Sequence, residues 1–281
     1  MLKQRVITAI VMLIILLPAL FYRAALPFFL IAMVLICVAA WEWARLNGYG
    51  QAHSVLSGLF CFLLCTASWL MGMLEQSLGL LWIAAGACWT FAGAWVLYRG
   101  VSAWASHSRP MRLLAGLLAL WLAWLAVAQA KSVGVNFLLS ILLLVWVADI
   151  FAYFAGRALG GRLSRSKLAS SISPGKSWEG VWGGMIGVLV LAFAWQLADK
   201  AFAATIPSVF SRIGMHGALT LVVCSLFLTA MSVLGDLFES LVKRSAGVKD
   251  SSGLLPGHGG VLDRIDALLP TLPLAMMLYS V

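Results

Sequence analysis

The sequence predicts an all-α integral membrane protein that crosses the bilayer about nine times. Of the 281 residues, 63% are hydrophobic and only 10% are charged. The mean hydropathy is +1.00, and apolar runs recur along the whole chain. Such values are atypical of water-soluble domains, whereas repeated runs of about 20 apolar residues are typical of transmembrane helices. We therefore expect a polytopic fold.

The predicted spans follow one another with short polar segments between them. They cover residues 6–22, 24–43, 54–74, 77–98, 111–130, 134–156, 180–198, 216–240 and 264–281. The first follows MLKQR, but it is long and no small-residue cleavage site follows closely, so we interpret it as a retained anchor. No internal repeat is visible. We assign residues 1–133 to N-terminal transmembrane helices and 134–281 to a C-terminal catalytic region.

The basic residues predict the orientation of these spans. With a cytoplasmic N-terminus, 15 of the 19 Lys and Arg residues fall on the cytoplasmic side, and only Arg23, Lys131, Lys200 and Arg212 fall outside. This places loops 157–179 and 241–263 in the cytoplasm and the chain in the inner (plasma) membrane. The net charge of +9 is explained by this bias and by contact with anionic membrane lipid, so no nucleic-acid partner is expected.

Two of the ten acidic residues need compensation. We expect Glu42, Glu75 and Asp199, at span ends or in loops, to be solvated. Asp149 in "LLVWVADIFAYFAG" and Asp236 in "SVLGDLFESL" instead lie in apolar spans, where an unpaired carboxylate costs roughly 2.5 to 3.5 kcal/mol or more.

Two explanations for these carboxylates stay open. Asp236, Glu239 and Ser240 share one helix face, and Asp263 and Asp266 have the same i, i+3 relation. They could pair with Arg264 or Lys243 and steady helix ends. Alternatively, oxygen ligands from separate helices converge on a divalent cation that bridges phosphates.

Two loops favour the phosphate-binding explanation. The stretch "GLLPGHGG" offers backbone N–H groups to a phosphate, and Lys243, Arg244, Lys249 and Arg264 flank it. His258 either contacts a ligand or makes a structural hydrogen bond. In the second loop, "SISPGKSWEG", Lys176 and Ser177 precede a helix, which also fits a capped, solvated helix start.

The C-terminal loop resembles the signature of the phosphatidate cytidylyltransferase (CDP-diacylglycerol synthase) family. The matching residues are Ser240, Lys243, Arg244, Lys249, Asp250, Pro256, His258, Gly259, Gly260, Asp263, Arg264 and Asp266. "ADIFAYFAGRALG" and "SISPGKSWEG" are similar to two other recurring segments of that family. The resemblance covers residues 145–281, whereas the first 130 residues match mainly as hydrophobic spans.

The resemblance implies a reaction and a set of site residues. The phosphate of phosphatidic acid attacks the α-phosphorus of CTP with the help of Mg²⁺, giving CDP-diacylglycerol and pyrophosphate; a second metal ion and a homodimer belong to the same expectations. We expect Asp236 and Asp263 to ligate metal, with Asp266 and Asp149 nearby. Lys243, Arg244, Lys249 and Arg264 would hold the phosphates of either substrate. Further substrate-binding candidates are Lys176, Ser177, Ser240, Asp250, His258, Gly259 and Gly260.

Two other functions remain as alternatives. A CTP-dependent lipid-alcohol kinase would transfer the γ-phosphoryl group, so that no cytidine would remain on the lipid. An ion-coupled transporter would also use intramembrane carboxylates, but the charges cluster near one face and no inverted repeat is visible. A CDP-alcohol transferase would need a D-x-x-D-G-type motif, which is not found.

Overall fold

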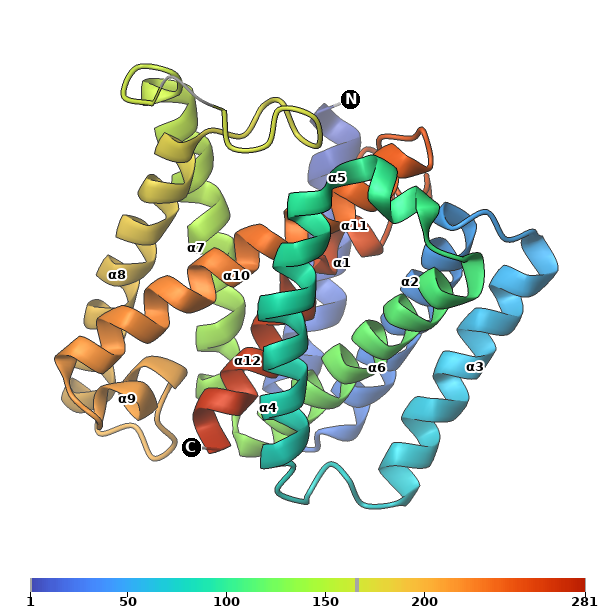
Figure 1. Cartoon of the computed structure of the whole chain (residues 1–281). Helices are drawn as coiled ribbons and strands as arrows, with labels where there is room; N and C mark the ends of the chain where they lie inside the picture. The colour runs from blue at the N-terminus through green and yellow to red at the C-terminus, as the bar shows by residue number, and fades with distance from the viewer. Residues whose placement is uncertain (1, 165–166, 281) are drawn as a thin grey trace.

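The computed structural model describes residues 2–164 and 167–280, which fold as an all-α protein (Figure 1). Within these ranges the only β-type pairings are two isolated bridges, Lys167 with Ser177 and Leu255 with Gly259. Arg165, one of the predicted cytoplasmic cations, and Val281, the end of the ninth predicted span, lie outside the described residues. The predicted fold class is confirmed.

Each predicted span corresponds to a helix or to a helical segment with a break. The elements are α1 (Leu2–Phe21), α2 (Leu26–Leu46), α3 (Gln51–Leu70), α4 (Gly79–Ala87), the π-helical turn η1 (Cys88–Gly93), α5 (Ala94–Ser106), α6 (Arg109–Val133), α7 (Val135–Leu159), α8 (Trp178–Ala201), α9 (Val209–Gly214), α10 (Ala218–Ser245), α11 (Leu262–Ile265) and α12 (Leu268–Ser280). The fourth predicted span comprises α4, η1 and part of α5. The short helix α9 was not predicted.

The first and last of the nine segments are shorter than expected for a full crossing. In the described residues, seven helical segments are long and apolar enough to span a membrane, and the apolar part of α1 is restricted to Val6–Phe21. The last predicted span is broken between α11 and α12, and α12 has 13 residues. At about 1.5 Å per residue, α12 covers roughly 20 Å of a hydrocarbon core of about 30 Å.

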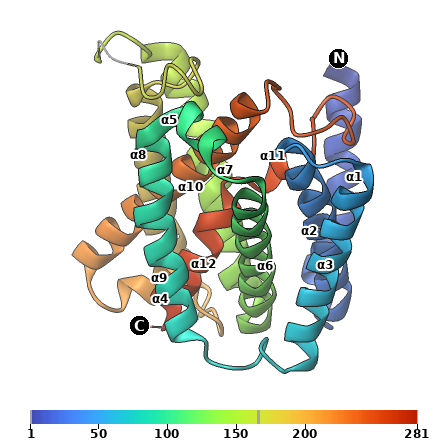
Figure 2. The same ribbon diagram turned by 45° about the vertical axis from the view of Figure 1, so that its right-hand side comes forward.

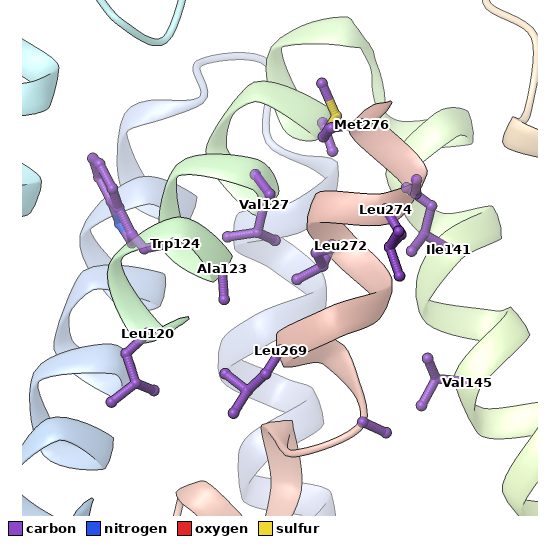
Figure 3. Close-up of a cluster of buried hydrophobic side chains, with 14 of the residues drawn as sticks. Leu120, Ala123, Trp124, Val127, Ile141, Val145, Leu269, Leu272, Leu274 and Met276 are labelled. Atoms are coloured by element: carbon purple, nitrogen blue, oxygen red, sulfur yellow. The ribbon is translucent and has the colours of Figure 1, made fainter. Parts of the chain in front are cut away.

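The short α12 lies inside the bundle. Its residues from Leu269 to Met276 are all buried. Figure 3 shows side chains of α6 and α7 on either side of it. The labelled members of this cluster are Leu120, Ala123, Trp124 and Val127 of α6, Ile141 and Val145 of α7, and Leu269, Leu272, Leu274 and Met276 of α12. A helix enclosed in this way needs no full-length lipid-facing surface, which accounts for its length.

Both polar loops lie at one end of the molecule. The start of α1, the loop between α7 and α8, and the loop between α10 and α11 are at the same end in two views (Figures 1 and 2). The C-terminus and α9 lie at the opposite end. The fold therefore brings the two predicted functional loops to one face.

Candidate active site

A cavity of about 410 Å³ lies between α7, α8, α10 and the loop that precedes α8. Its walls combine small apolar side chains with ionisable groups. The residues that line it are Ala148, Asp149, Ala152, Tyr153, Gly156, Arg157, Leu168, Gly175, Lys176, Ser177, Gly180, Val181, Gly184, Thr229, Val233 and Asp236. This composition suits a ligand with an apolar part and an anionic part.

One wall of the cavity is a close contact between α7 and α8. Glycines at positions 180, 183, 184 and 187 form one face of α8, and a Cβ at Gly183 would lie 2.2 Å from the Cβ of Ala155. A Cβ at Gly187 would lie 2.4 Å from the ring of Phe151. Small residues at such a face let two helix backbones approach closely inside a membrane. The glycines thus fix α7, and with it Asp149, against α8.

The loop before α8 is fastened to both helices. Ser177 caps α8, because its Oγ accepts a hydrogen bond from the N–H of Gly180 at 3.2 Å. The buried Glu179 accepts through Oε1 from the N–H groups of Gly161, Leu163 and Ser164, at 2.7 to 3.1 Å. The loop is therefore held on both sides of Lys176.

Lys176 and Asp236 form an ion pair across the cavity. Their side chains are 27% and 31% exposed, so the pair is open to a ligand. The hydroxyl of Ser240 donates to Asp236 Oδ1 at 3.4 Å. Asp149 lines the same cavity and repels Asp236 electrostatically. Predicted candidates from α7, α10 and the loop before α8 thus meet at one place.

Asp266 lies close to this group, beside Gly235 of α10. It lies between α11 and α12, and a Cβ at Gly235 would lie 2.5 Å from its carbonyl oxygen. Its carboxylate repels that of Asp236. Asp236 is therefore repelled by both Asp149 and Asp266, while Lys176 forms an ion pair with Asp236. Within the described ranges, however, no three His, Cys, Asp or Glu side chains are spaced to hold a metal ion.

A second charged cluster lies one helical turn further along α10. Lys243 donates to Asp263 Oδ1 at 2.6 Å and also forms an ion pair with Glu239. The Asp263 Oδ2 atom accepts from the N–H and Oγ of Ser251, at 2.9 and 2.8 Å, and from the N–H of Gly260 at 2.7 Å. Protein donors therefore occupy both oxygens of Asp263.

The charge state of Asp263 follows from these contacts. Burial raises its pKa, but the hydrogen bonds from Lys243 and Gly260 outweigh burial and bring the pKa to about 2. Charge-assisted hydrogen bonds of this kind favour the ionised carboxylate. Asp263 is consequently an anion at neutral pH.

The glycine-rich loop turns tightly above Asp263. Gly259 has φ = +81°, and a Cβ there would lie 2.6 Å from Asp263 Oδ2. Arg264 donates to the carbonyl of His258 at 2.9 Å, and Arg244 donates to the carbonyl of Ile172 at 3.2 Å, which connects the two loops. The Nδ1 atom of His258 is buried and lacks a hydrogen-bond partner within the described ranges. Gly259 suits this position because the backbone has a positive φ and leaves no room for a side chain beside the Asp263 carboxylate.

Lys249 and Asp250 lie on the exposed surface of this loop. Within the described ranges neither side chain makes a hydrogen bond or an ion pair, unlike Lys243, Arg244 and Arg264. Both are therefore accessible to a ligand arriving at this end of the molecule.

The expectation that Glu42 and Asp199 are solvated was wrong. Glu42 is 0% exposed and accepts from the Ser252 Oγ at 2.5 Å, the Leu262 N–H at 2.7 Å and the Val261 N–H at 3.0 Å. Asp199 accepts from both Ser208 and Ser211 and anchors the α8–α9 connection. Sequence reasoning missed them because a carboxylate at a span end can equally point to water. Glu75 is exposed, as expected.

The whole chain is similar to known cytidylyltransferases. A model described as "Cytidylyltransferase family" matches residues 3–281. A phosphatidate cytidylyltransferase of Pseudomonas aeruginosa is 39% identical over 100% of this chain and 98% of its own length. One of Haemophilus influenzae is 38% identical over 99% of each chain. The similarity thus extends through the N-terminal half, which the sequence motifs alone did not reveal.

Proposed function

Because this chain belongs to the cytidylyltransferase family, we propose that the cavity between α7, α8 and α10 is where its transfer reaction takes place. The chain is a phosphatidate cytidylyltransferase, which makes CDP-diacylglycerol and pyrophosphate from phosphatidic acid and CTP. The single observation that supports the location is the meeting of Asp149, Asp236 and Lys176 at one apolar-walled cavity. The sites and roles that follow are our proposals.

The reaction needs little proton transfer from the protein. The nucleophile is a phosphate oxygen of phosphatidic acid, which is already an anion, and the bond that breaks joins the α- and β-phosphates of CTP. Positioning two anions and neutralising their charge are therefore the main tasks of the protein. Accordingly, the site consists of cations and carboxylates rather than a nucleophile with a general base.

We assign the cations by their positions. Lys176 lines the cavity and would bind a phosphate once it leaves Asp236. Lys249 and Arg264 are exposed beside the glycine loop and would bind the triphosphate of CTP. Lys243 already contacts two carboxylates, Glu239 and Asp263, and would mainly position Asp263. The small apolar residues Ala148 and Ala152 would face the glycerol and the start of the acyl chains.

The carboxylates fit a divalent cation in charge. Asp236 repels both Asp149 and Asp266, and like charges at such a site are commonly compensated by a cation. These three residues would hold Mg²⁺ only after their carboxylates move closer together, because they are not spaced as a ligand set in the described residues. Asp263 could join them only by exchanging Lys243 for the ion. When bound, Mg²⁺ would neutralise phosphate charge.

We place the end of the molecule that carries both loops in the cytoplasm, where CTP is found. The excess of Lys and Arg in the predicted inside segments supports this orientation. A homodimer stays a prediction from the family resemblance, and the mass of the protein–detergent complex would test it.

Product analysis tests the proposed reaction. Purified protein in detergent is incubated with Mg²⁺, phosphatidic acid and CTP labelled at either the α- or the γ-phosphate. We expect α-label in the lipid product and γ-label in pyrophosphate. Transfer of γ-label to a lipid would identify a kinase, and an absence of CTP-dependent chemistry would favour a transporter.

A further inference from the structure

A carboxylate from the N-terminal half is built into the C-terminal loop. Glu42, on α2, is 0% exposed and lies against Ser251, Ser252, Val261 and Leu262. Oε1 accepts from Ser252 Oγ and the Val261 N–H, and Oε2 accepts from the Leu262 N–H and, at 3.3 Å, from Ser251 Oγ. All four donors are neutral. No Lys, Arg or His of the described ranges is within salt-bridge distance of Glu42.

A buried carboxylate without a cation is expensive unless several donors surround it. The donors here come from both ends of the glycine-rich loop, residues 251–262, so the carboxylate joins the start of the loop to its end. The loop tip makes one further contact with the N-terminal half, because Thr8 Oγ1 donates to the carbonyl of Pro256 at 2.9 Å.

Glu42 and Asp263 hold the same loop from two sides. Ser251 Oγ lies 2.8 Å from Asp263 Oδ2 and 3.3 Å from Glu42 Oε2, so its single proton can serve only one carboxylate at a time. Gly260 separates the two acids: a Cβ there would lie 2.0 Å from Ser251 Oγ and 2.3 Å from Glu42 Oε1. The position of Asp263 and its partner Lys243 thus depends on a loop that Glu42 fixes.

We propose that Glu42 is a positioning residue for the transfer reaction, which acts by locking the glycine-rich loop so that Asp263, Lys243 and Arg264 face the substrates correctly. This rests on the proposed function of that loop. It also gives the N-terminal half a part in catalysis beyond anchoring, because α2 supplies the carboxylate.

The decisive variant is Glu42→Gln. Glutamine has the same size, but one of its terminal atoms is an NH₂ donor that would face N–H and O–H donors. We expect the loop to loosen and kcat/KM for CTP to fall about ten- to hundredfold per folded molecule, since small misplacements of reacting groups cost this much. Glu75→Gln is the matched control, because Glu75 is exposed at the other end of the molecule and should stay within about twofold of wild type.

A second readout does not depend on activity. Lys249 is exposed within the segment between α10 and α11, so trypsin can cut after it and release a piece that begins at Asp250. We expect this cut to be at least about threefold faster in Glu42→Gln than in wild type and in Glu75→Gln, because a loosened loop reaches the protease more often. If wild type showed no cytidylyl transfer, the proposed function would fail while this comparison would still report on the lock.

Ser252→Ala is a second variant, which keeps the proposal testable if Glu42→Gln folds poorly. It removes one of the four donors to Glu42 and should lower kcat/KM and speed cleavage in the same direction, by smaller factors. The double variant should be no worse than Glu42→Gln alone, because both changes act on one interaction.

Two results would overturn the proposal. One is wild-type kcat/KM and cleavage in folded Glu42→Gln, or in Ser252→Ala should the first variant not fold. The other is reduced yield or thermal stability while the surviving folded protein keeps wild-type kcat/KM, which would make Glu42 a purely structural residue.

Discussion

Asp263→Asn and Asp236→Asn should differ in stability although both lose activity. Asp263 is 5% exposed and its partner Lys243 is 11% exposed, so the first change leaves a buried ammonium with Glu239 as its remaining anion. Breaking a buried pair costs about 3 to 5 kcal/mol, and because Glu239 remains we expect a value near the lower limit. The Ser251 and Gly260 donors would also compete with Lys243 for a single acceptor oxygen.

The pair of Asp236 with Lys176 is much more exposed, at 31% and 27%. Pairs of this kind contribute about 0 to 1 kcal/mol, so Asp236→Asn should unfold almost like wild type. Thermal unfolding in detergent, followed by tryptophan fluorescence, and cytidylyl transfer at equal amounts of folded protein give the two readouts. Equal melting of both variants, or a larger loss for Asp236→Asn, would refute this account of the two acids.

Three further predictions concern the loops and the orientation. Lys176→Ala should keep the fold but lower kcat/KM for CTP by about a hundredfold, as expected for a lost charge contact in the transition state; an unchanged kcat/KM would return the loop before α8 to a structural role. Gly260→Ala should displace the glycine-rich loop and strongly reduce transfer, whereas Gly253→Ala, where nothing lies within 4 Å of the added carbon, should behave like wild type; similar behaviour of the two variants would contradict the packing described. In a background without native cysteines, Lys200→Cys should react with an impermeant maleimide on intact cells and Lys249→Cys should not, and the opposite pattern would reverse the orientation.

The helical membrane architecture could be predicted from the sequence because the thickness of a bilayer sets the length of the apolar runs that cross it. The same reasoning did not predict the length and environment of the last helix. Residues from Ala267 onward are as apolar as a lipid-facing helix, yet α12 is a short helix that packs against α4, α6, α7 and α10. Apolar composition cannot distinguish a surface that faces lipid from one that faces other helices.

The candidate site was predicted in part. Asp149, Asp236 and Lys176 were each predicted as site residues, and they line one cavity; their roles there stay predictions. The prediction of metal ligation by Asp263 remains open, because its oxygens contact Lys243, Ser251 and Gly260. Sequence spacing indicates which residues share a helix face, but hydrogen-bond partners that come from loops depend on tertiary packing.

Glu42 illustrates the same limit more sharply. It lies between Trp41 and Trp43 at the end of an apolar run, three residues before Arg45. A carboxylate at such a position can extend to water or bury itself against a loop, and the choice depends on residues 251–262, about 210 positions away. The family resemblance did not help, because it rested on the C-terminal segments.

The most direct test of the central claim asks whether substrates occupy the cavity between α7, α8 and α10. Ala152→Cys places a single thiol in its wall, and Ser132→Cys places one in a separate cavity formed by the α3–α4 connection, α6 and α12, both in a background without native cysteines. We expect a bulky maleimide at position 152 to abolish cytidylyl transfer, CTP with phosphatidic acid to slow that labelling, and labelling at position 132 to leave transfer unchanged. Full activity after complete modification of position 152 would contradict the account.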